Sequence, residues 1–508
     1  MIRIRRAVVL FLTILLSLAL LFPQAAQRER FAQMFARAYF PGRSGQIFIV
    51  PRRNDVIVRG TEDLQYMHGS PWEYDVHIPL LFYGPAFIRK GVFSSARLQD
   101  VVPTLARLIR VHRDSDGQAL AQILQPRRRA PRVIATVMVD AGRYDYFDRF
   151  ARQLPAFSRL RSKGAWFTGC RLNYIPTVTA VAHSVVGSGY DPRRTGIVVN
   201  SVYSNSTGKY EAIWPKNSPV NLQTPTLADQ WNLQTEGKSI IIAQGGVFYA
   251  AGSMVGHGGC LHNAKKVIAY GYGDSSGVFE SDPSCYVIPD YLQKMNARDY
   301  WERAGGKWMG HDVASPRKFR PSALFGEFES DSLQKTLEAE SIGQDEITDL
   351  VFVNFKTLDY VGHKFGPDSP EIAGSMPVLN RFFERLIAVL EKKAGADGFV
   401  LVVTADHGMP PAPEPLGHLR VREADFLKTV RDKFDTNNNG KELFLAFQDS
   451  NLQFVVDQEE LRLLGLTLKD ITSYLETLDS VEYAYTEEEI REALGRIIAS
   501  ESKAPIPE

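Results

Sequence analysis

Two short segments of the chain each pair a carboxylate with a histidine, and such pairs could hold metal ions. Asp359 and His363 lie four residues apart, and Asp406 is followed directly by His407 and Gly408, a glycine that lets the backbone turn tightly. Carboxylate and imidazole ligands together suit zinc and, less sharply, manganese. Two such ions about 4 Å apart can clamp the attacking and leaving oxygens of a phosphoryl group. Three further histidines have no such partner and are interpreted as surface or core residues: His112, His311 and His418.

The segment Pro176-Thr-Val-Thr-Ala180 has the pattern of a nucleophile site. Apolar residues followed by Gly187 and Gly189 predict a helix that begins near Thr179, and a helix start presents free N–H groups and a positive dipole to an anion. A threonine hydroxyl needs activation before it can attack, and no histidine–aspartate relay is evident beside this one. Metal coordination is the activation that we expect. The alternative is that Thr179 only caps the helix.

The elements that must position these residues are buried strands. Three apolar runs end in or near an aspartate: 133–139 before Asp140, 350–355 before Asp359, and 399–405 before Asp406. Continuous β-branched runs indicate strands buried on both faces, as in a parallel sheet, and apolar residues at helical spacing over 379–390 predict a helix that stops near Gly395. The expected fold is therefore α/β. Ligands of such sheets bind beyond the carboxyl ends of the strands, where the three aspartates would converge. Taken singly, each aspartate is most often a helix cap.

Composition excludes some classes of function. Lysine and arginine number 59 against 58 aspartates and glutamates, a net charge of +1, which disfavours nucleic-acid binding through bulk charge. The length of 508 residues suggests about three domains. Three cysteines are too few for a disulfide scaffold; in an exported chain Cys260 and Cys285 could pair and leave Cys170 free, or all three could stay unpaired.

The N-terminal segment 1–27 is interpreted as a signal peptide or a retained N-terminal anchor. Arg3, Arg5 and Arg6 precede a sixteen-residue apolar run over 7–22, and alanines follow it. The run is shorter than the roughly 20 residues that span a bilayer comfortably. In both interpretations the rest of the chain is exported, either periplasmic or extracellular, or tethered to a membrane through residues 7–22 and facing outward.

Four motifs resemble those of the alkaline phosphatase superfamily. They are Asp140-Ala-Gly-Arg-Tyr-Asp-Tyr-Phe-Asp-Arg149, Pro176-Thr-Val-Thr179, Asp359-x-x-x-His363 and Asp406-His407-Gly408. The similar branches are the type I phosphodiesterases/nucleotide pyrophosphatases and the alkaline phosphatases with a threonine nucleophile. The resemblance implies an alkaline-phosphatase-like, mostly parallel central sheet flanked by helices, with cap insertions. Together these motifs are highly specific, although each alone is not.

A further zinc histidine of that superfamily, in a sequence like His-Gly-Ser-Pro, is expected after Asp406 but stands at the other end of the chain. His68-Gly-Ser-Pro begins a segment to Pro85 that resembles the superfamily's closing segment; 100–106 resembles the helix after it, and 44–50 the strand before it. The resemblance thus implies a circular permutation, which the proximity of domain termini makes physically acceptable. The expected organisation is a permuted C-terminal core portion at 44–125, a linker at 126–131, the main core at 132–412 with an insertion at about 271–345, and a cap or insertion at 413–500.

Carried over residue by residue, the resemblance implies two divalent ions, most simply Zn²⁺. One would be held by Asp359, His363 and His68, and the other by Asp140, Asp406 and His407, with Thr179 as nucleophile and metal ligand. Asn200 matches an asparagine that holds a phosphate oxygen in the superfamily; otherwise it is a turn residue. His183 is interpreted as structural. The implied reaction forms a phosphothreonine that water then hydrolyses.

One departure from the superfamily bears on the substrate, which is expected to be a small-molecule phosphoester. Threonine-type monoesterases carry a lysine and an arginine for the extra phosphate charge, and the corresponding stretch, 241–252, has neither. This favours a phosphodiesterase or nucleotide pyrophosphatase, and Gly245, Gly246, Phe248 and Tyr249 could instead accept a base or another apolar group. The alternatives are a phosphomonoesterase and, if the anchor is retained, a membrane-associated phospho-group transferase. A sulfatase is disfavoured because Thr179 stands where it would need cysteine or serine.

Overall fold

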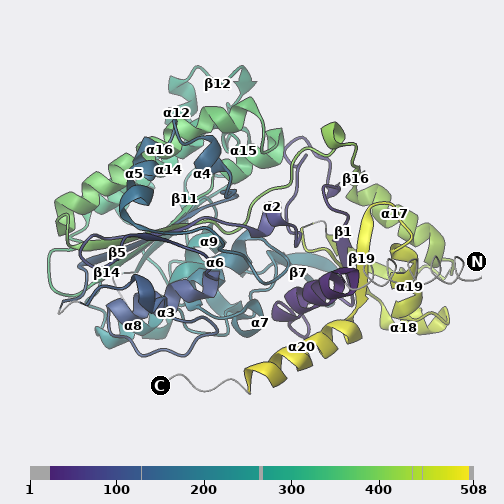
Figure 1. Ribbon diagram of the computed structural model, residues 1–508. Helices are drawn as coiled ribbons and strands as arrows, with labels where there is room; N and C mark the ends of the chain where they lie inside the picture. Colours follow the sequence, from purple (N-terminus) through teal and green to yellow (C-terminus); the bar gives the residue numbers. More distant parts are fainter. Residues whose placement is uncertain (1–22, 127–128, 263–266, 438, 449, 503–508) are drawn as a thin grey trace, which may run out of the picture.

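The main body of the molecule is built on one large sheet. The computed structural model describes residues 23–126, 129–262, 267–437, 439–448 and 450–502 (Figure 1). Nine strands form this sheet in the order β11-β10-β9-β14-β5-β15-β3-β6-β4. Chain order and sheet order differ, and helices lie between most of the strands that follow one another in the chain, as in other α/β folds.

The middle of the sheet consists of the three predicted apolar runs. They form β5 (Val133–Val139), β14 (Asp349–Phe355) and β15 (Phe399–Thr404), and every residue of these strands is buried. β14 and β15 lie on either side of β5, both parallel to it. β9 (Ile241–Gly245) and β10 (Val267–Tyr272) continue the parallel arrangement beyond β14. The prediction of a mostly parallel α/β sheet is confirmed.

Helices cover both faces of the sheet. In Figure 1, α5 (Pro155–Lys163), α14 (Ala323–Ala339) and α16 (Pro370–Ala394) lie above it, and α3 (Val101–Leu108), α6 (Thr179–Ser188) and α9 (Phe248–Val255) lie below it. α16 contains the predicted helix: the Ser369 hydroxyl accepts the N–H of Ile372 at its start, and the helix ends at Gly395. The sheet is therefore buried on both sides, which explains its continuous apolar strands.

The N-terminal segment 44–125 completes one end of the large sheet. β3 (Leu80–Tyr83) pairs antiparallel with β15 and with β6 (Ala165–Phe167), and β4 (Gly91–Phe93) pairs with β6. Of the predicted linker 126–131, residues 127 and 128 lie outside the described residues. β3 separates the parallel strands from the outer pair β6 and β4, so an early segment of the chain adds to a sheet whose central strands come later.

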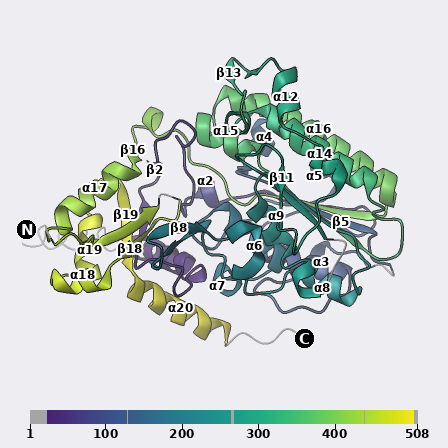
Figure 2. The same ribbon diagram turned by 180° about the vertical axis from the view of Figure 1, so that it is seen from behind.

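A smaller antiparallel sheet stands beside the main body. It contains β17 (Phe444–Gln448), β18 (Gln453–Val456), β1 (Ile47–Pro51) and β19 (Val481–Thr486), in that order. Around it lie α17 (Glu423–Phe434), α18 (Gln458–Leu463), α19 (Leu468–Leu475) and α20 (Glu487–Glu501), seen from both sides in Figures 1 and 2. The predicted cap at 413–500 thus shares a sheet with the strand at 44–50.

A helix over residues 23–37 packs on this smaller sheet. Phe31 contacts Tyr483, and Phe35 contacts Tyr485. Arg37 Nη1 lies 3.5 Å from Glu501 at the end of α20, so the first and last described helices meet. Residues 23–27 of this helix belong to the predicted signal or anchor segment, of which residues 1–22 lie outside the described residues. Of the helices that the structure describes, none is both long and apolar enough to cross a membrane.

The predicted insertion at 271–345 has two parts. Residues 323–339 form α14, which packs against α16 on the sheet, whereas α12 (Arg298–Arg303) and the hairpin β12 (Lys307–Trp308) and β13 (His311–Asp312) stand out at the top of Figure 1.

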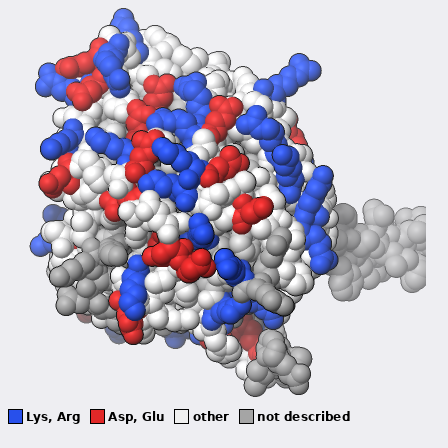
Figure 3. Space-filling model, turned by 90° about the vertical axis from the view of Figure 1, so that its left-hand side faces the viewer, with Lys and Arg blue, Asp and Glu red and all other residues white. Residues whose placement is uncertain are grey.

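A disulfide joins Cys260 to Cys285, and Cys170 is buried and free. On the face in Figure 3, basic and acidic side chains are interspersed, as the net charge of +1 suggests.

Candidate functional site

The three strand-end aspartates meet at the carboxyl edge of the parallel sheet. Asp140 directly follows β5, and Asp406 follows β15 with one residue between them. Asp359 lies in the first turn of α15 (Thr357–Phe365), the helix that comes after β14. Their side chains are 0–1% exposed. Because parallel strands deliver their carboxyl ends to one edge, neighbouring strands bring residues together that are far apart in sequence. The predicted convergence is confirmed.

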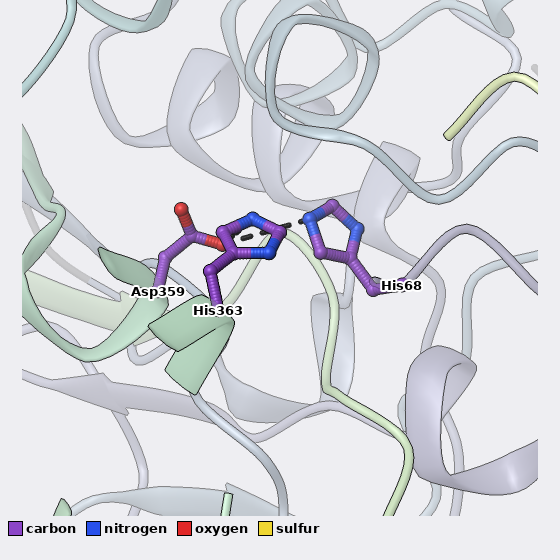
Figure 4. A group of neighbouring side chains, drawn as sticks. All are labelled: His68, Asp359 and His363. Carbon is purple, nitrogen blue, oxygen red and sulfur yellow. Dashed lines mark ion pairs between the residues drawn. The ribbon is translucent and has the colours of Figure 1, made fainter. Parts of the chain in front are cut away.

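One group consists of His68, Asp359 and His363 (Figure 4). Asp359 Oδ1 lies 3.5 Å from His68 Nε2 and 3.2 Å from His363 Nε2. Their candidate ligand atoms all lie within 4.8 Å of one another, so a single ion could contact all three. The two residues from α15 are one helical turn apart and share a face of the helix, whereas His68 reaches them from a distant part of the chain.

A second group consists of Asp140, Asp406 and His407. His407 Nε2 lies 3.2 Å from Asp406 Oδ2 and 3.6 Å from Asp140 Oδ1. Asp406 Oδ1 accepts the backbone N–H groups of Ala141 and His407, which leaves Oδ2 turned toward the imidazole. Asp359 is also within reach of Asp140 and His407, so the two groups adjoin.

The three histidines are oriented in the same way. Nδ1 of His68 lies 2.8 Å from the carbonyl of Thr177, Nδ1 of His363 lies 2.6 Å from that of Tyr66, and Nδ1 of His407 lies 2.9 Å from that of Gly408. A carbonyl only accepts, so each Nδ1 carries the proton and each Nε2 keeps a free lone pair. This is the usual way in which proteins fix the tautomer of a metal-binding histidine.

Several polar atoms of these groups lack a partner, which fits a cation. Asp359 Oδ1, Asp406 Oδ2 and His407 Nε2 are buried without a hydrogen bond. Burial raises the pKa of Asp140 well above its usual value and that of Asp406 to about 6, and it lowers the pKa of His68 and His407, which favours their neutral, ligating form. Buried carboxylates with bare acceptor atoms are costly unless cations neutralise them, so this donor set suits divalent metal ions.

Thr179 is the first residue of α6, so the predicted helix start is confirmed. Its side chain is buried and accepts a hydrogen bond from Lys356, which also contacts Asp140 and Asp359, so the start of the helix lies beside the two groups. The N–H of Ala180 donates to Asn200 Oδ1 over 2.9 Å, which leaves the amide N–H groups of Asn200 available to a ligand. Both Thr179 and Asn200 line a cavity at the site.

The sequence interpretation missed a lysine at the centre of the site. Lys356 Nζ lies 3.0 Å from Asp140, 2.6 Å from Asp359 and 2.9 Å from Thr179 Oγ1, and its side chain is 4% exposed. The neighbouring Asn354 donates to Asp140 Oδ2 over 2.7 Å. The sequence did contain a signal: Lys356 immediately follows the mostly apolar run 350–355 and precedes Asp359 by three residues, and a lysine there cannot easily reach solvent.

His183 is held by hydrogen bonds on both ring nitrogens. Nδ1 lies 2.7 Å from the carbonyl of Thr179, and Nε2 lies 3.0 Å from the amide of Asn354. Its distance from Asp406 Oδ2 is 3.8 Å, and burial lowers its pKa to about 3. Because both nitrogens are already used, His183 is a neutral residue that orients its neighbours, in line with the structural interpretation.

A cavity of about 340 Å³ opens over Thr179 and the first group. Its wall includes Tyr249 and Tyr360 from the core and Arg317 and Arg320 from the insertion. Phe248 is buried in the core instead. Three other histidines form local pairs and do not line this cavity: His257 with Asp229, His311 with Glu371 and His418 with Asp55.

With this geometry in view, the comparisons identify the family. The family profile described as type I phosphodiesterase / nucleotide pyrophosphatase matches residues 134–497. The chain belongs to this family. Its members include phosphoester hydrolases, and the chain is such an enzyme. The match begins at residue 134, so His68 lies outside it although the structure places His68 beside Asp359 and His363.

Relatives within the curated proteins include alkaline phosphatases. The alkaline phosphatase PafA of Elizabethkingia meningoseptica is 25% identical over 427 residues, covering 72% of this chain and 76% of that enzyme. PhoV of Synechococcus elongatus is 26% identical over 339 residues, covering 56% of this chain and 60% of that enzyme. The crystal structure of wild-type PafA matches with a TM-score of 0.56 at 22% identity, covering 76% of this chain and 82% of that one, which shows a shared fold.

Proposed function

We propose that this member of the family is an exported, metal-dependent hydrolase of phosphoric esters that acts through a phosphothreonine intermediate on Thr179. The observation that carries the proposal is the position of Thr179 Oγ1. It lies at the start of a helix and accepts from Lys356, beside two adjoining groups of aspartates and histidines in which Asp359 Oδ1, Asp406 Oδ2 and His407 Nε2 have no hydrogen-bond partner. A helix start and cations together attract the phosphoryl group to that oxygen.

His68, Asp359 and His363 would hold one divalent ion, and Asp140, Asp406 and His407 the other; with their histidine and carboxylate ligands, zinc is the first candidate. When bound, the ions supply Lewis acidity and positive charge to the phosphoryl group. Thr179 would be a ligand as well as the nucleophile.

The reaction itself is carried by the side chain of Thr179. Its hydroxyl loses a proton and its oxygen forms a bond to phosphorus while the bond to the leaving oxygen breaks, and the leaving oxygen takes up a proton. Water then attacks the phosphothreonine, the Thr179–phosphorus bond breaks, a proton from that water returns to the Thr179 oxygen, and the phosphate product leaves. Asn200 uses its free amide N–H groups to bond a phosphoryl oxygen as negative charge develops on it.

The substrate class has two candidates. A phosphodiester or nucleotide pyrophosphate agrees with the family description and with the absence of lysine and arginine from 241–252. A phosphomonoester is favoured by the alkaline phosphatase relatives and by Lys356, whose ammonium lies beside Thr179 Oγ1.

Export is supported by two independent features of the chain. Residues 1–22 have the basic start and short apolar run of a signal or anchor. The Cys260–Cys285 disulfide suits an oxidising compartment outside the cytosol.

We also infer that the core is circularly permuted. His68 lies before the matched region yet completes the first group, and Arg37 of the first described helix meets Glu501 at the end of α20. Chain ends that meet at the surface are the situation in which reordering preserves a core.

The test compares wild type, Thr179→Ala and Thr179→Ser with zinc on a bis-aryl phosphate diester and the matching monoester. We expect Thr179→Ala to fall to background on both esters while keeping its zinc, and acid quenching of the wild type to trap phosphate on residue 179. Activity of Thr179→Ala within ten-fold of wild type would refute the role of Thr179 as the nucleophile. A ten-fold or greater preference of the wild type for the monoester would exclude the diesterase candidate.

A further inference from the structure

Lys356 is a buried cation at the centre of the site. Its ammonium contacts two aspartates of different groups, Asp140 at 3.0 Å and Asp359 at 2.6 Å, and it also donates to Thr179 Oγ1 over 2.9 Å. The ammonium therefore touches the atom that the proposed reaction uses.

The surrounding structure is shaped to hold this lysine. A Cβ atom on Gly246 would lie 2.2 Å from Lys356 Cβ and 2.8 Å from its Cγ, so the aliphatic stem needs a glycine at position 246. Glu329 on α14 accepts the backbone N–H groups of Lys356 and Thr357 over 2.9 and 3.2 Å and the Thr357 hydroxyl over 2.7 Å. These contacts fix the turn after β14 and leave the ammonium little freedom.

The position of Gly246 links the lysine to the stretch 241–252. That stretch carries no lysine or arginine, and the residue of it nearest to Lys356 is a glycine that makes room for the stem. β9, which contains the first part of the stretch, is the sheet neighbour of β14. The stretch 241–252 supplies no positive charge to the nucleophile. Lys356, directly after the neighbouring strand β14, supplies one instead.

We propose that Lys356 is a catalytic residue that bonds the oxygen of Thr179 and a non-bridging oxygen of the transferred phosphoryl group, and so selects doubly charged phosphate monoesters. This inference rests on the proposed function. Divalent ions held by the same carboxylates would compete with the ammonium for Asp140 and Asp359, whereas its contact with Thr179 Oγ1 remains. Three carboxylates against two divalent ions leave one positive charge, and Lys356 raises the surplus to two, the charge that a monoester dianion needs.

The experiment uses the variants Lys356→Met, Lys356→Gln and Lys356→Arg of the zinc-loaded enzyme. Gln keeps a donor without the charge, and Arg keeps the charge. Lys428→Met is the matched control, because Lys428 is 71% exposed on α17 and pairs with Asp432 of the same helix. Three quantities are measured: kcat/KM for an aryl phosphate monoester and the matching diester, the zinc content, and the affinity for inorganic phosphate by calorimetry.

For Lys356→Met and Lys356→Gln we expect monoester kcat/KM to fall about 100- to 1000-fold and diester kcat/KM to fall less than about 10-fold. Affinity for phosphate should weaken at least about 10-fold, with two zinc ions kept per chain. Lys356→Arg should recover part of the monoester activity, and Lys428→Met should match wild type. If Lys356→Met does not fold, Gly246→Ala tests the same point, because the added Cβ displaces the lysine stem and should lower the monoester-to-diester ratio.

Equal losses on both esters, or an unchanged affinity for phosphate, would overturn the inference. A zinc content of one ion per chain in the wild type and two in Lys356→Met would also overturn it, because the ammonium would then occupy the place of an ion. These results are distinct from failure of the proposed function. If Thr179→Ala is inactive while Lys356→Met keeps the wild-type ratio between esters, only the role of Lys356 fails; an active Thr179→Ala removes the proposed function itself.

Discussion

The two halves of the site are built in different ways. The strand-end half, Asp140, Asp406 and His407, follows β5 and β15, which are neighbours in the centre of the sheet. The loop half, His68, Asp359 and His363, combines one turn of α15 with a histidine from a loop near the start of the chain. The strand-end half is positioned by the buried core itself, whereas the loop half is complete only when the His68 loop docks correctly.

The docking of that loop depends on a few polar contacts. His68 Nδ1 bonds the carbonyl of Thr177, and Asp75 Oδ2 accepts the N–H groups of Gly69 and Ser70 over 3.2 and 2.8 Å. These contacts connect the loop to the segment that leads into Thr179. Changes in the strand-end half should therefore damage chemistry outright, and changes around the loop should be graded.

The largest effect is expected for Asp406→Asn in the strand-end half. The change removes a charged ligand atom and leaves an amide facing His407, so one ion should be lost and kcat/KM should fall by a factor of about 1000 or more. Zinc analysis and ester assays measure both effects. Asp432→Asn is the control, because Asp432 is an exposed carboxylate on α17. Activity within ten-fold of wild type would show that the strand-end half is not catalytic.

His68→Ala should remove one ion and keep the other. The truncated side chain leaves Asp359 and His363 with too few ligands, while Asp140, Asp406 and His407 are unchanged, so zinc content should fall from two to one and activity by about 100-fold or more. His112→Ala, at an exposed position, is the control. Full zinc occupancy in His68→Ala would contradict both the ligand role and the permuted order.

The difference between the halves also explains what could be predicted from the sequence. The positions of Asp140 and Asp406 could be predicted because an uninterrupted apolar run indicates a buried strand, and parallel strands bring their carboxyl ends together. No local pattern marks His68 as a ligand; only the resemblance of the segment after it pointed to the site. Contacts between residues almost 300 positions apart leave no periodicity in either segment.

Other features were missed for related physical reasons. Lys356 was overlooked because lysine is ordinarily a surface residue, and its burial depends on Glu329, Gly246 and two aspartates from separate elements. The smaller sheet joins β1 to strands more than 390 positions later, and those strands are short and amphipathic. Pairing over such a distance is set by tertiary packing rather than by local propensity.

Gly69→Ala should weaken the loop half without removing a ligand. Gly69 has φ of +128°, and an added Cβ would lie 2.8 Å from the carbonyl oxygen of Ser450, so the loop must shift and carry His68 with it. We expect zinc affinity at one of the two sites to fall about 10- to 100-fold. Gly42→Ala is the control, because its φ of +79° imposes a similar backbone cost with no atom within 4 Å. Equal zinc affinities in the two variants would show that the loop tolerates displacement.

The smallest effect on activity, and a clear dependence on pH, is expected for Asp75→Asn. Burial raises the pKa of Asp75 from 3.8 to about 7, so the folded protein binds this proton more tightly than the unfolded chain does. The stability that Asp75 contributes is therefore complete below about pH 4 and is lost as the pH rises through 7. Asparagine does not titrate in that range. The free energy of unfolding of the variant minus that of wild type should therefore increase by about 1–3 kcal/mol between pH 5 and pH 8. Urea unfolding of both proteins in chelator measures this difference without a contribution from metal binding. A difference that stays constant over this range would mean that Asp75 is ionised in the folded protein, and that the loop holding His68 rests on a charged carboxylate.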